Sequence, residues 1–492
     1  MEQANGLQNW VNGLDRRVYA ALVGTALGIT GGAIALMLAA LGPTITFGAV
    51  AGLLAGLYVL SNVSAALYGV IAVTVLLPFG TLPFSIGITP TFLDMAMGAF
   101  LMVYLLQWMT GQRHGLRLTP IHALVALYVL WLLLAFALGL RYAMPTSATA
   151  RQFAETLLSI GMVFVLVDLL REPAALRRLV LAVMLAVGAQ ALVAIGLYLL
   201  PDEAAERTLV RLARIGYPNG GVIRYIEDNP ELAERAIGTW VDPNALGGIL
   251  AISAATIAPQ LFARRPVLRY RWMTVTVLGV VTLALMLTFS RASMLAFAIG
   301  VCFIGLFPGY RKYLALVALG GCLVLLLPQT RDYVERFAQA FTATDLATQM
   351  RIGEYGDSLE LIGQHPITGV GFTGTPTITL YTDVASMYLI MANQIGLVGV
   401  GAFLTLIGGV FLYGWRARQF AQQMPELESI HLGYHAALLT ALINATADLY
   451  FFRLDFHASI TSFWLIVALA LASSRLALDE HESTVAKTAR FR

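Results

Sequence analysis

The chain contains few charged residues. Asp, Glu, Lys and Arg make up only 12% of its 492 residues, whereas 58% are hydrophobic. Soluble domains typically carry about 25% charged residues, so this composition excludes a soluble globular protein. Apolar runs of about 20 residues, the length of a helix that crosses a bilayer, recur along the sequence. The sequence therefore predicts an all-α, polytopic integral membrane protein.

Cysteine and lysine are nearly absent. The two cysteines, Cys302 and Cys322, lie inside apolar runs, where free thiols behave as small hydrophobic groups, and no disulfide framework is expected. The net charge is +3, and the basic residues form small clusters between apolar segments. Such clusters are topology signals, so no nucleic-acid partner is predicted.

Apolar length predicts about 12–14 membrane spans, because the second and third of the fourteen candidates are short enough to form one broken hairpin. The candidates are 18–41, 45–60, 63–79, 90–110, 120–140, 152–170, 179–200, 237–262, 273–289, 292–309, 313–328, 385–413, 430–450 and 457–474. We expect three regions: N-terminal transmembrane helices (1–200), a core with two long outer loops (201–413), and C-terminal transmembrane helices with a cytoplasmic tail (414–492). The tail is polar from about Ser473, and we expect it to be mobile.

Charge bias predicts the orientation of the chain. Alternate short loops are basic, as the positive-inside rule requires of cytoplasmic loops, and both termini fall on that side. The two lysines, Lys312 and Lys487, lie in these segments. The opposite loops include 201–236 and 329–384, where every cation is an arginine. A guanidinium grips phosphate with a planar fork of donors, so this outer face is suited to phosphate.

The first outer loop carries arginines and an unusual helix entrance. Arg207, Arg211 and Arg214 have the spacing of one helix face, which either meets anionic groups or is a solvated surface; Arg224 follows. The stretch from Arg235 to Asn244 then places polar residues where a span begins. A helix N-cap explains Asp242 and Pro243, but it does not explain Arg235.

Further candidates lie later in the chain. Arg291 occupies the joint between two apolar runs and either snorkels to the interface or serves a function. Arg351 opens an acidic helical stretch that includes Glu354. His365 precedes a proline and is either a titrating group or a loop spacer. The pair Gly369 and Gly371 predicts a turn rather than a phosphate cradle, since no strand precedes it.

Together these motifs resemble the O-antigen ligase/polymerase superfamily. The ordered set covers roughly residues 230–410. It consists of Arg235 to Gly238 running into Pro243-Asn244, then Ser290-Arg291, His365-Pro366, Gly369-Val370-Gly371, Tyr388-Leu389 and Gly396-Leu397-Val398-Gly399. No single motif is specific, but the order and spacing of the set are. The first two hundred residues agree only in being hydrophobic.

The resemblance implies a glycosyltransferase of the bacterial inner membrane whose active site faces the periplasm. Its donor would be a glycan on undecaprenyl diphosphate, its acceptor a glycan or lipid, and its surroundings membrane lipids; it would need no cofactor and no metal. Arg235 and Arg291 match the arginines that hold the donor diphosphate in the family. We expect the remaining substrate-binding candidates to be Arg211, Arg214, Arg224, Asn244, Arg351, His365 and Tyr388.

One departure from the family pattern shifts the expected reaction. Ligases of this superfamily carry a histidine shortly before the Tyr-Leu pair, and here Ala385 is nearest that position. The absence favours a polymerase over transfer to lipid A core, which remains the alternative. Asp383 is the first candidate for a proton-accepting carboxylate and Glu354 the second. A transporter of an anionic solute, with the same arginines as a selectivity site, is the alternative of another class.

Overall fold

The computed structural model describes residues 61–82, 89–326, 346–374 and 384–490, together with scattered positions between Val18 and Val59. The chain divides into two compact units, Met1–Ala66 and Leu67–Arg492. Nearly all of the described residues belong to the second unit. Its described part is almost entirely helical, which confirms the predicted all-α class.

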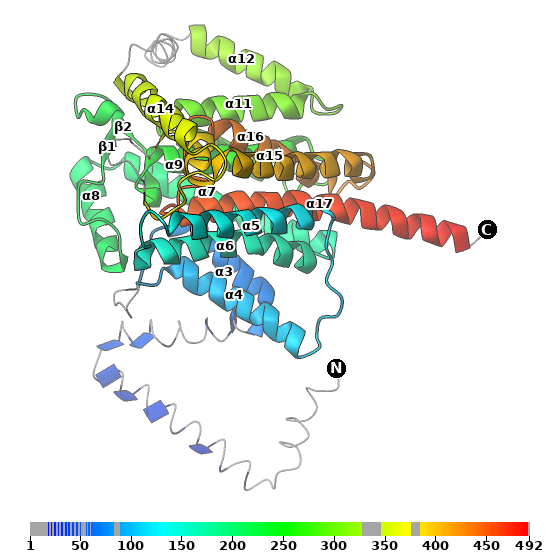
Figure 1. Ribbon diagram of the computed structural model, residues 1–492. Coiled ribbons are helices and arrows are strands. Elements are labelled where there is room, and N and C mark those ends of the chain that lie inside the picture. Colours follow the sequence, from blue (N-terminus) through cyan, green and yellow to red (C-terminus); the bar gives the residue numbers. More distant parts are fainter. Residues whose placement is uncertain are drawn as a thin grey trace. The chain divides into compact units, whose positions relative to one another are not determined.

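Long apolar helices form the body of this unit (Figure 1). Among the described residues, seven helices are long and apolar enough to cross a membrane: α4, α5, α6, α7, α9 with the 3-10 turn that follows it, α15 and α17. The chain is therefore a multi-pass membrane protein. The bounds are α3 Val63–Leu76, α4 Phe92–Met109, α5 Ile121–Gly139, α6 Ser147–Leu169, α7 Pro173–Tyr198, α9 Pro243–Ile257, α10 Arg271–Leu287, α11 Arg291–Gly305, α12 Lys312–Leu326, α15 Met387–Ala421, α16 Glu428–Asn444 and α17 His457–Arg490.

The C-terminal helix differs from the prediction. A polar tail was expected from about Ser473, but α17 continues to Arg490, and Ser473, Ser474 and Arg475 are buried. The Arg475 guanidinium donates to the carbonyl of Leu170 at 2.6 Å. A buried arginine that satisfies a free carbonyl at the end of a neighbouring helix explains why the polar residues continue the packed helix.

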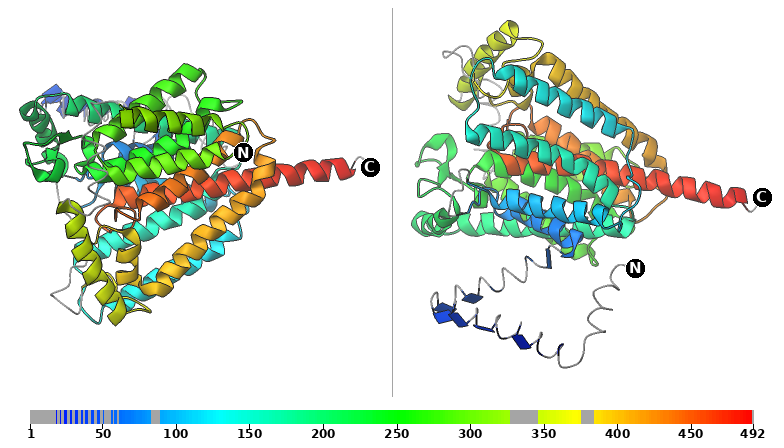
Figure 2. Two further views of the ribbon diagram at one scale, coloured as in Figure 1. Left: turned by 90° about the horizontal axis from the view of Figure 1, so that it is seen from above. Right: turned by 60° about the horizontal axis from the view of Figure 1, so that its bottom comes forward.

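The two outer loops occupy one end of the bundle, opposite the C-terminal end of α17 (Figures 1 and 2). The first contains α8 (Asp202–Val210) and two short strands, β1 (Arg224–Tyr225) and β2 (Glu234–Arg235), which pair antiparallel. The second contains α14 (Leu346–Gln364). The two segments that the sequence assigns to one face thus lie at the same end of the unit.

Loops that charge bias assigns to the other face also lie together. The Arg177 guanidinium donates to the carbonyls of Arg265 at 2.9 Å, Pro266 at 2.8 Å and Glu426 at 3.3 Å. Arg265 in turn pairs with the Glu426 carboxylate at 2.7 Å. These contacts join three basic loops at one end of the helices. That this end is cytoplasmic remains a prediction.

Helix α15 is interrupted at Gly396, and the end of the second outer loop docks into the interruption. Gly396 adopts φ 69° and ψ 175°. The backbone amide of Leu397 donates to Pro366, and the amides of Val370 and Gly371 donate to the carbonyls of α15 just before the break, all within 2.9 Å. Gly369 and Gly371 both have positive φ. The predicted turn at these glycines is therefore confirmed, and its role is close backbone contact.

We predict that Gly396→Ala destabilises the protein by about 1–3 kcal/mol, because the φ and ψ at this position are accessible essentially only to glycine. A Cβ atom would also overlap the carbonyl of Ile367. The control is Gly401→Ala in the same helix, where a Cβ meets nothing within 4 Å. It should be neutral or stabilising by up to about 1 kcal/mol. Thermal unfolding in one detergent measures both, and equal melting temperatures would contradict the prediction.

Candidate active site

Arg235 forms the centre of a polar cluster at the outer end of the bundle. Its Nε donates to the carbonyl of Thr288 at 2.8 Å, and one terminal nitrogen donates to Asn244 Oδ1 at 2.6 Å. The neighbouring amide of Ala236 donates to Leu287 at 2.8 Å. Burial lowers the pKa of Arg235, whereas the charge of Asp242 raises it. Since a guanidinium does not lose its proton in proteins, a partly buried cation is held here.

The segment that follows Arg235 is fixed by buried contacts. Gly238 has φ +53°, and Trp240, fully buried, donates from Nε1 to Val75 at 3.0 Å. Asp242 Oδ1 accepts from the amides of Asn244 and Ala245, both at 2.8 Å. The N-cap interpretation of Asp242 is thus confirmed. Because Asp242 binds only the backbone amide of Asn244, the side-chain oxygen of Asn244 can accept from Arg235.

The first turns of α9 and α11 pack closely beside this cluster. A Cβ on Gly247 would lie 2.9 Å from Ser290 Cβ and 3.0 Å from Ser293 Oγ. Ser293 in turn donates to Asn444 Oδ1 at 2.9 Å. The first amide of α15, at Met387, donates to Ala445 and Asp448 in the loop after α16. Three helix N-termini, each with positive partial charge, therefore meet the segments around Arg235.

Two residues beside the cluster have strained backbone conformations. Val241 has φ 60° and Phe289 has φ 52°, values that branched or bulky residues rarely adopt. Val241 lies between Arg235 and its partner Asn244, and Phe289 follows Thr288, which supplies the other acceptor. Strain of this kind costs on the order of 1–3 kcal/mol per residue and tends to concentrate at functional sites.

Asp448 is a buried carboxyl that the sequence analysis missed. It lies in the loop between α16 and α17 and is 3% exposed, and its Oδ2 has no hydrogen-bond partner. Burial raises the pKa of Asp448 to about 7, although the charges of Arg351 and Arg235 act to lower it. A carboxyl that titrates near neutral pH beside arginines is suited to accepting a proton. The sequence does carry one signal for this site, because an acidic residue inside the predicted span 430–450 is unusual.

Tyr450 belongs to the same loop. Burial raises the pKa of its hydroxyl, and the charges of Asp242 and Asp448 raise it further. The phenol is therefore neutral and able to donate. Arg235, Asp448 and Tyr450 thus act on one another electrostatically, and a group of donors with one titratable carboxyl can bind an anion and take up a proton.

The predicted arginines are distributed unevenly around this cluster. The positive charge of Arg351, which lies on α14, acts to lower the pKa of Asp448. Arg291 is the first residue of α11, three residues after Thr288, and three residues of chain reach about 11 Å at most. Arg235 and Asn244 are thus brought together, Arg351 acts electrostatically on Asp448, and Arg291 is nearby in the chain. Convergence of the two guanidinium groups of Arg235 and Arg291 remains a prediction.

The first outer loop is helical where the arginine stripe is predicted. The α-helix ends at Val210, and a 3-10 turn (Arg211–Ile215) follows. Arg207, Arg211 and Arg214 are all exposed, and three residues per turn keep Arg211 and Arg214 on one side of the 3-10 turn. That this stripe binds substrate stays a prediction. Arg207 pairs with Glu203 in solvent. The predicted substrate-binding residues of this loop, Arg211, Arg214 and Arg224, are exposed.

The remaining candidates have mainly structural partners. Glu354 Oε2 accepts from the amide of Ala385 at 3.2 Å, and the Tyr388 hydroxyl donates to the carbonyl of Leu442 at 2.9 Å. The ring of His365 lies 3.4 Å from the hydroxyl of Tyr142. Asp383, the first candidate base, lies outside the described residues.

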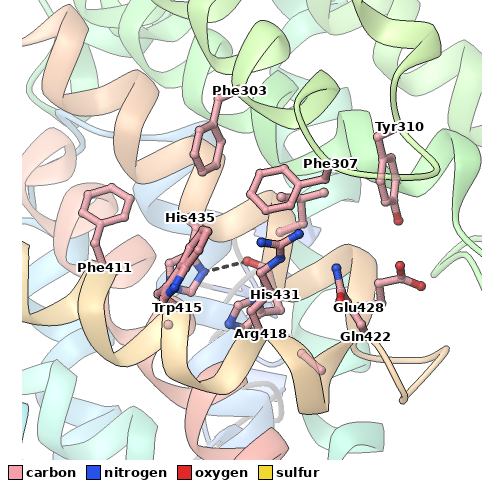
Figure 3. Close-up of a pocket in the computed structure, with 13 residues that line it drawn as sticks. Phe303, Phe307, Tyr310, Phe411, Trp415, Arg418, Gln422, Glu428, His431 and His435 are labelled. Atoms are coloured by element: carbon pink, nitrogen blue, oxygen red, sulfur yellow. Dashed lines mark hydrogen bonds between the residues drawn. The ribbon is translucent and has the colours of Figure 1, made fainter.

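A separate aromatic pocket lies at the other ends of α11, α15 and α16 (Figure 3). In it the Arg418 guanidinium lies 4.4 Å from the ring centre of Phe307 and 5.0 Å from that of Trp415. The cavity measures about 60 Å³, room for a few waters only. Phe307 is sixteen residues from Arg291, or about 24 Å along a helix. This pocket is therefore distinct from the Arg235 cluster.

Among the described residues, one group of side chains has donor atoms close enough together to hold a metal ion, namely Asp94, Glu155 and His457. It shares no residue with the Arg235 cluster.

Part of the chain is similar to a known protein family. Residues 275–404 match a family model described as O-Antigen ligase. The match runs from α10 into α15 and includes Arg291, Arg351 and Glu354, and it confirms the resemblance over this range. No curated protein matches the chain. The chain is a multi-pass membrane protein in which residues 275–404 are similar to the O-antigen ligase family.

Proposed function

We propose that the Arg235 cluster is the site at which a glycan is transferred from a lipid diphosphate, in a polymerase-type reaction on the periplasmic side of the membrane. The observation that carries the proposal is the position of Arg235. It binds Thr288 and Asn244 directly. Thr288 belongs to the joint that precedes Arg291, which lies inside the range matched by the O-antigen ligase family.

The cluster fits the charge of the leaving group. Transfer breaks the bond between the anomeric carbon and the diphosphate oxygen, and the electron pair leaves with the diphosphate. Donors fixed in advance where this negative charge develops lower the barrier most. Arg235, Arg291 and Arg351 supply guanidinium groups, and the N-termini of α9, α11 and α15 add positive partial charge. These groups would hold the donor without a metal.

Asp448 is the proton acceptor in this proposal. The attacking hydroxyl of the acceptor sugar forms the new bond to the anomeric carbon, and its proton passes to the Asp448 carboxylate. A pKa of about 7 suits this role, because the group is half ionised near neutral pH and still basic enough to take the proton. Glu354 is bound to the amide of Ala385, so it positions that segment. Asp383 remains the alternative acceptor.

The choice of polymerase rests on the absent histidine. Ala385 is nearest to the position at which ligases of the family carry this histidine. It contributes only its backbone to the contacts with Glu354 and Tyr355. A ligase of the family would place an imidazole here. With a lipid-linked repeat as both donor and acceptor, the expected product is a longer lipid-linked chain.

The test is a reconstituted reaction in liposomes with one defined undecaprenyl-diphosphate-linked repeat. Polymerisation predicts a ladder of longer lipid-linked chains and release of undecaprenyl diphosphate. Transfer to added lipid A core without a ladder would show a ligase instead. Movement of an anionic solute across the bilayer without transfer would show the transporter and contradict the proposal.

We predict that Arg235→Lys lowers turnover by about 10²–10³-fold, the range measured when one donor to a developing anion is removed. The ammonium keeps the charge but lacks the planar fork that reaches Thr288 and Asn244 together. The matched control is Arg207→Lys, since Arg207 is exposed and pairs only with Glu203 in the contacts described. Its turnover should equal wild type. Initial rates of ladder formation measure both, and equal rates for the two variants would contradict the assignment.

A pH dependence follows from the raised pKa of Asp448. The base acts only when ionised, so kcat/KM should rise with pH through about 7 and level off above it. Asp448→Asn should remove this inflection and lower kcat by about 10²–10⁴-fold.

The matched control for this profile is Glu234→Gln. Burial and the charge of Asp202 raise the pKa of Glu234 to about 7 as well, yet this residue has no role in the proposed chemistry. Its variant should keep the inflection. Loss of the inflection in Glu234→Gln, or its survival in Asp448→Asn, would exclude Asp448 as the proton acceptor.

A further inference from the structure

Three helices bring two carboxylates and an imidazole together inside the bundle. Asp94 is in the first turn of α4, Glu155 in α6, and His457 at the start of α17. His457 Nδ1 lies 3.5 Å from Glu155 Oε2 and 3.8 Å from Asp94 Oδ1. One donor atom from each of the three residues lies within 4.8 Å of the others.

The two carboxylates use different oxygens for different partners. Asp94 Oδ2 accepts from the amide of Thr91 at 2.8 Å and from Arg151 at 3.3 Å. Glu155 Oε1 accepts from Arg151 at 2.8 Å. These contacts leave Asp94 Oδ1 and Glu155 Oε2 facing the imidazole. An arrangement in which outer partners fix the orientation of inner donors is characteristic of metal ligands.

The imidazole has no partner of its own. His457 is 8% exposed at the side chain, and neither ring nitrogen has a hydrogen-bond partner. A buried polar group without a partner costs free energy. Because Nδ1 is directed toward two carboxylate oxygens at distances too long for good hydrogen bonds, a group placed between the three would satisfy all of them.

We propose that Asp94, Glu155 and His457 bind a divalent cation of the Zn²⁺ class. Zinc bonds to nitrogen and carboxylate oxygen are about 2.0–2.2 Å long, so neighbouring ligands of a tetrahedral ion lie about 3.3–3.6 Å apart. The two separations from His457, 3.5 and 3.8 Å, need to close by only a few tenths of an ångström. An imidazole ligand favours zinc over magnesium or calcium, and a water would complete the four ligands.

Charge supports the same occupant. Arg151 pairs with both carboxyl groups, at 3.3 Å from Asp94 and 2.8 Å from Glu155. A divalent cation would take the place of the hydrogen bond that the two carboxyls share, and it would bind the imidazole, which has no hydrogen-bond partner. The site would join α4, α6 and α17, and would fix the loop that ends at His457 nine residues after Asp448. This inference is independent of the proposed transfer reaction, which takes no step through the ion.

The experiment uses the full chain, purified in detergent and stripped with a chelator. Co²⁺ is then added, because four-coordinate Co²⁺ absorbs strongly in the visible range where Zn²⁺ is silent. We expect one equivalent to bind with the spectrum of a tetrahedral site, and Zn²⁺ to displace it. Absence of stoichiometric binding would overturn the proposal, and the cluster would then hold a proton instead.

Variants locate the ion. Glu155→Gln keeps an oxygen for Arg151 but loses the charge, and it should weaken Co²⁺ binding by at least about tenfold, the lower limit seen even for outer partners of a metal. His457→Ala should abolish the tetrahedral spectrum. The matched control is His122→Ala, which removes another buried histidine with an unpartnered Nε2 and should bind as wild type. Unchanged binding in Glu155→Gln and His457→Ala would place the ion elsewhere and overturn the proposal.

Discussion

The burial of the Arg235 guanidinium constrains the whole outer end of the bundle. A buried cation is tolerated only where acceptors and negative charge surround it. The carbonyl of Thr288 and the amide oxygen of Asn244 meet the first need, and Asp242 and Asp448 contribute to the second. The start of α9, the joint before α11 and the loop after α16 are therefore held around one side chain.

This arrangement has costs that folding alone does not require. Val241 and Phe289 adopt left-handed backbone conformations, and Asp448 retains an unpartnered oxygen. Each feature lowers the stability of the fold, and each lies beside Arg235 or a residue that interacts with it. An anionic ligand would balance the excess of positive charge that the arginines and helix N-termini create there. The same end of the bundle carries the two outer loops, so a lipid-linked glycan would meet the cluster at the membrane edge.

The helices could be predicted from the sequence, because apolar runs long enough to span a bilayer leave little choice of structure. The predicted span 120–140, for example, is α5, Ile121–Gly139. Arg235 was identified because an N-cap explains Asp242 but leaves the arginine unexplained. The turn at Gly369 and Gly371 followed from local residue preferences, although its docking into the break at Gly396 did not.

Contacts between distant segments could not be predicted in the same way. Asp448 fell inside a predicted span, because hydropathy does not show that α16 ends at Asn444 and that a loop folds back to Met387. Asp94, Glu155 and His457 come from three helices and have no common motif.

The most direct test of the central claim is an experimental structure of the protein with undecaprenyl diphosphate in a lipid nanodisc. A binding site at the Arg235 cluster predicts phosphate density within hydrogen-bond distance, about 2.7–2.9 Å, of the guanidinium groups of Arg235 and Arg291, with Asp448 beside the terminal phosphate. Diphosphate bound elsewhere, or guanidinium groups about 20 Å or more apart, beyond the reach of one diphosphate, would contradict it.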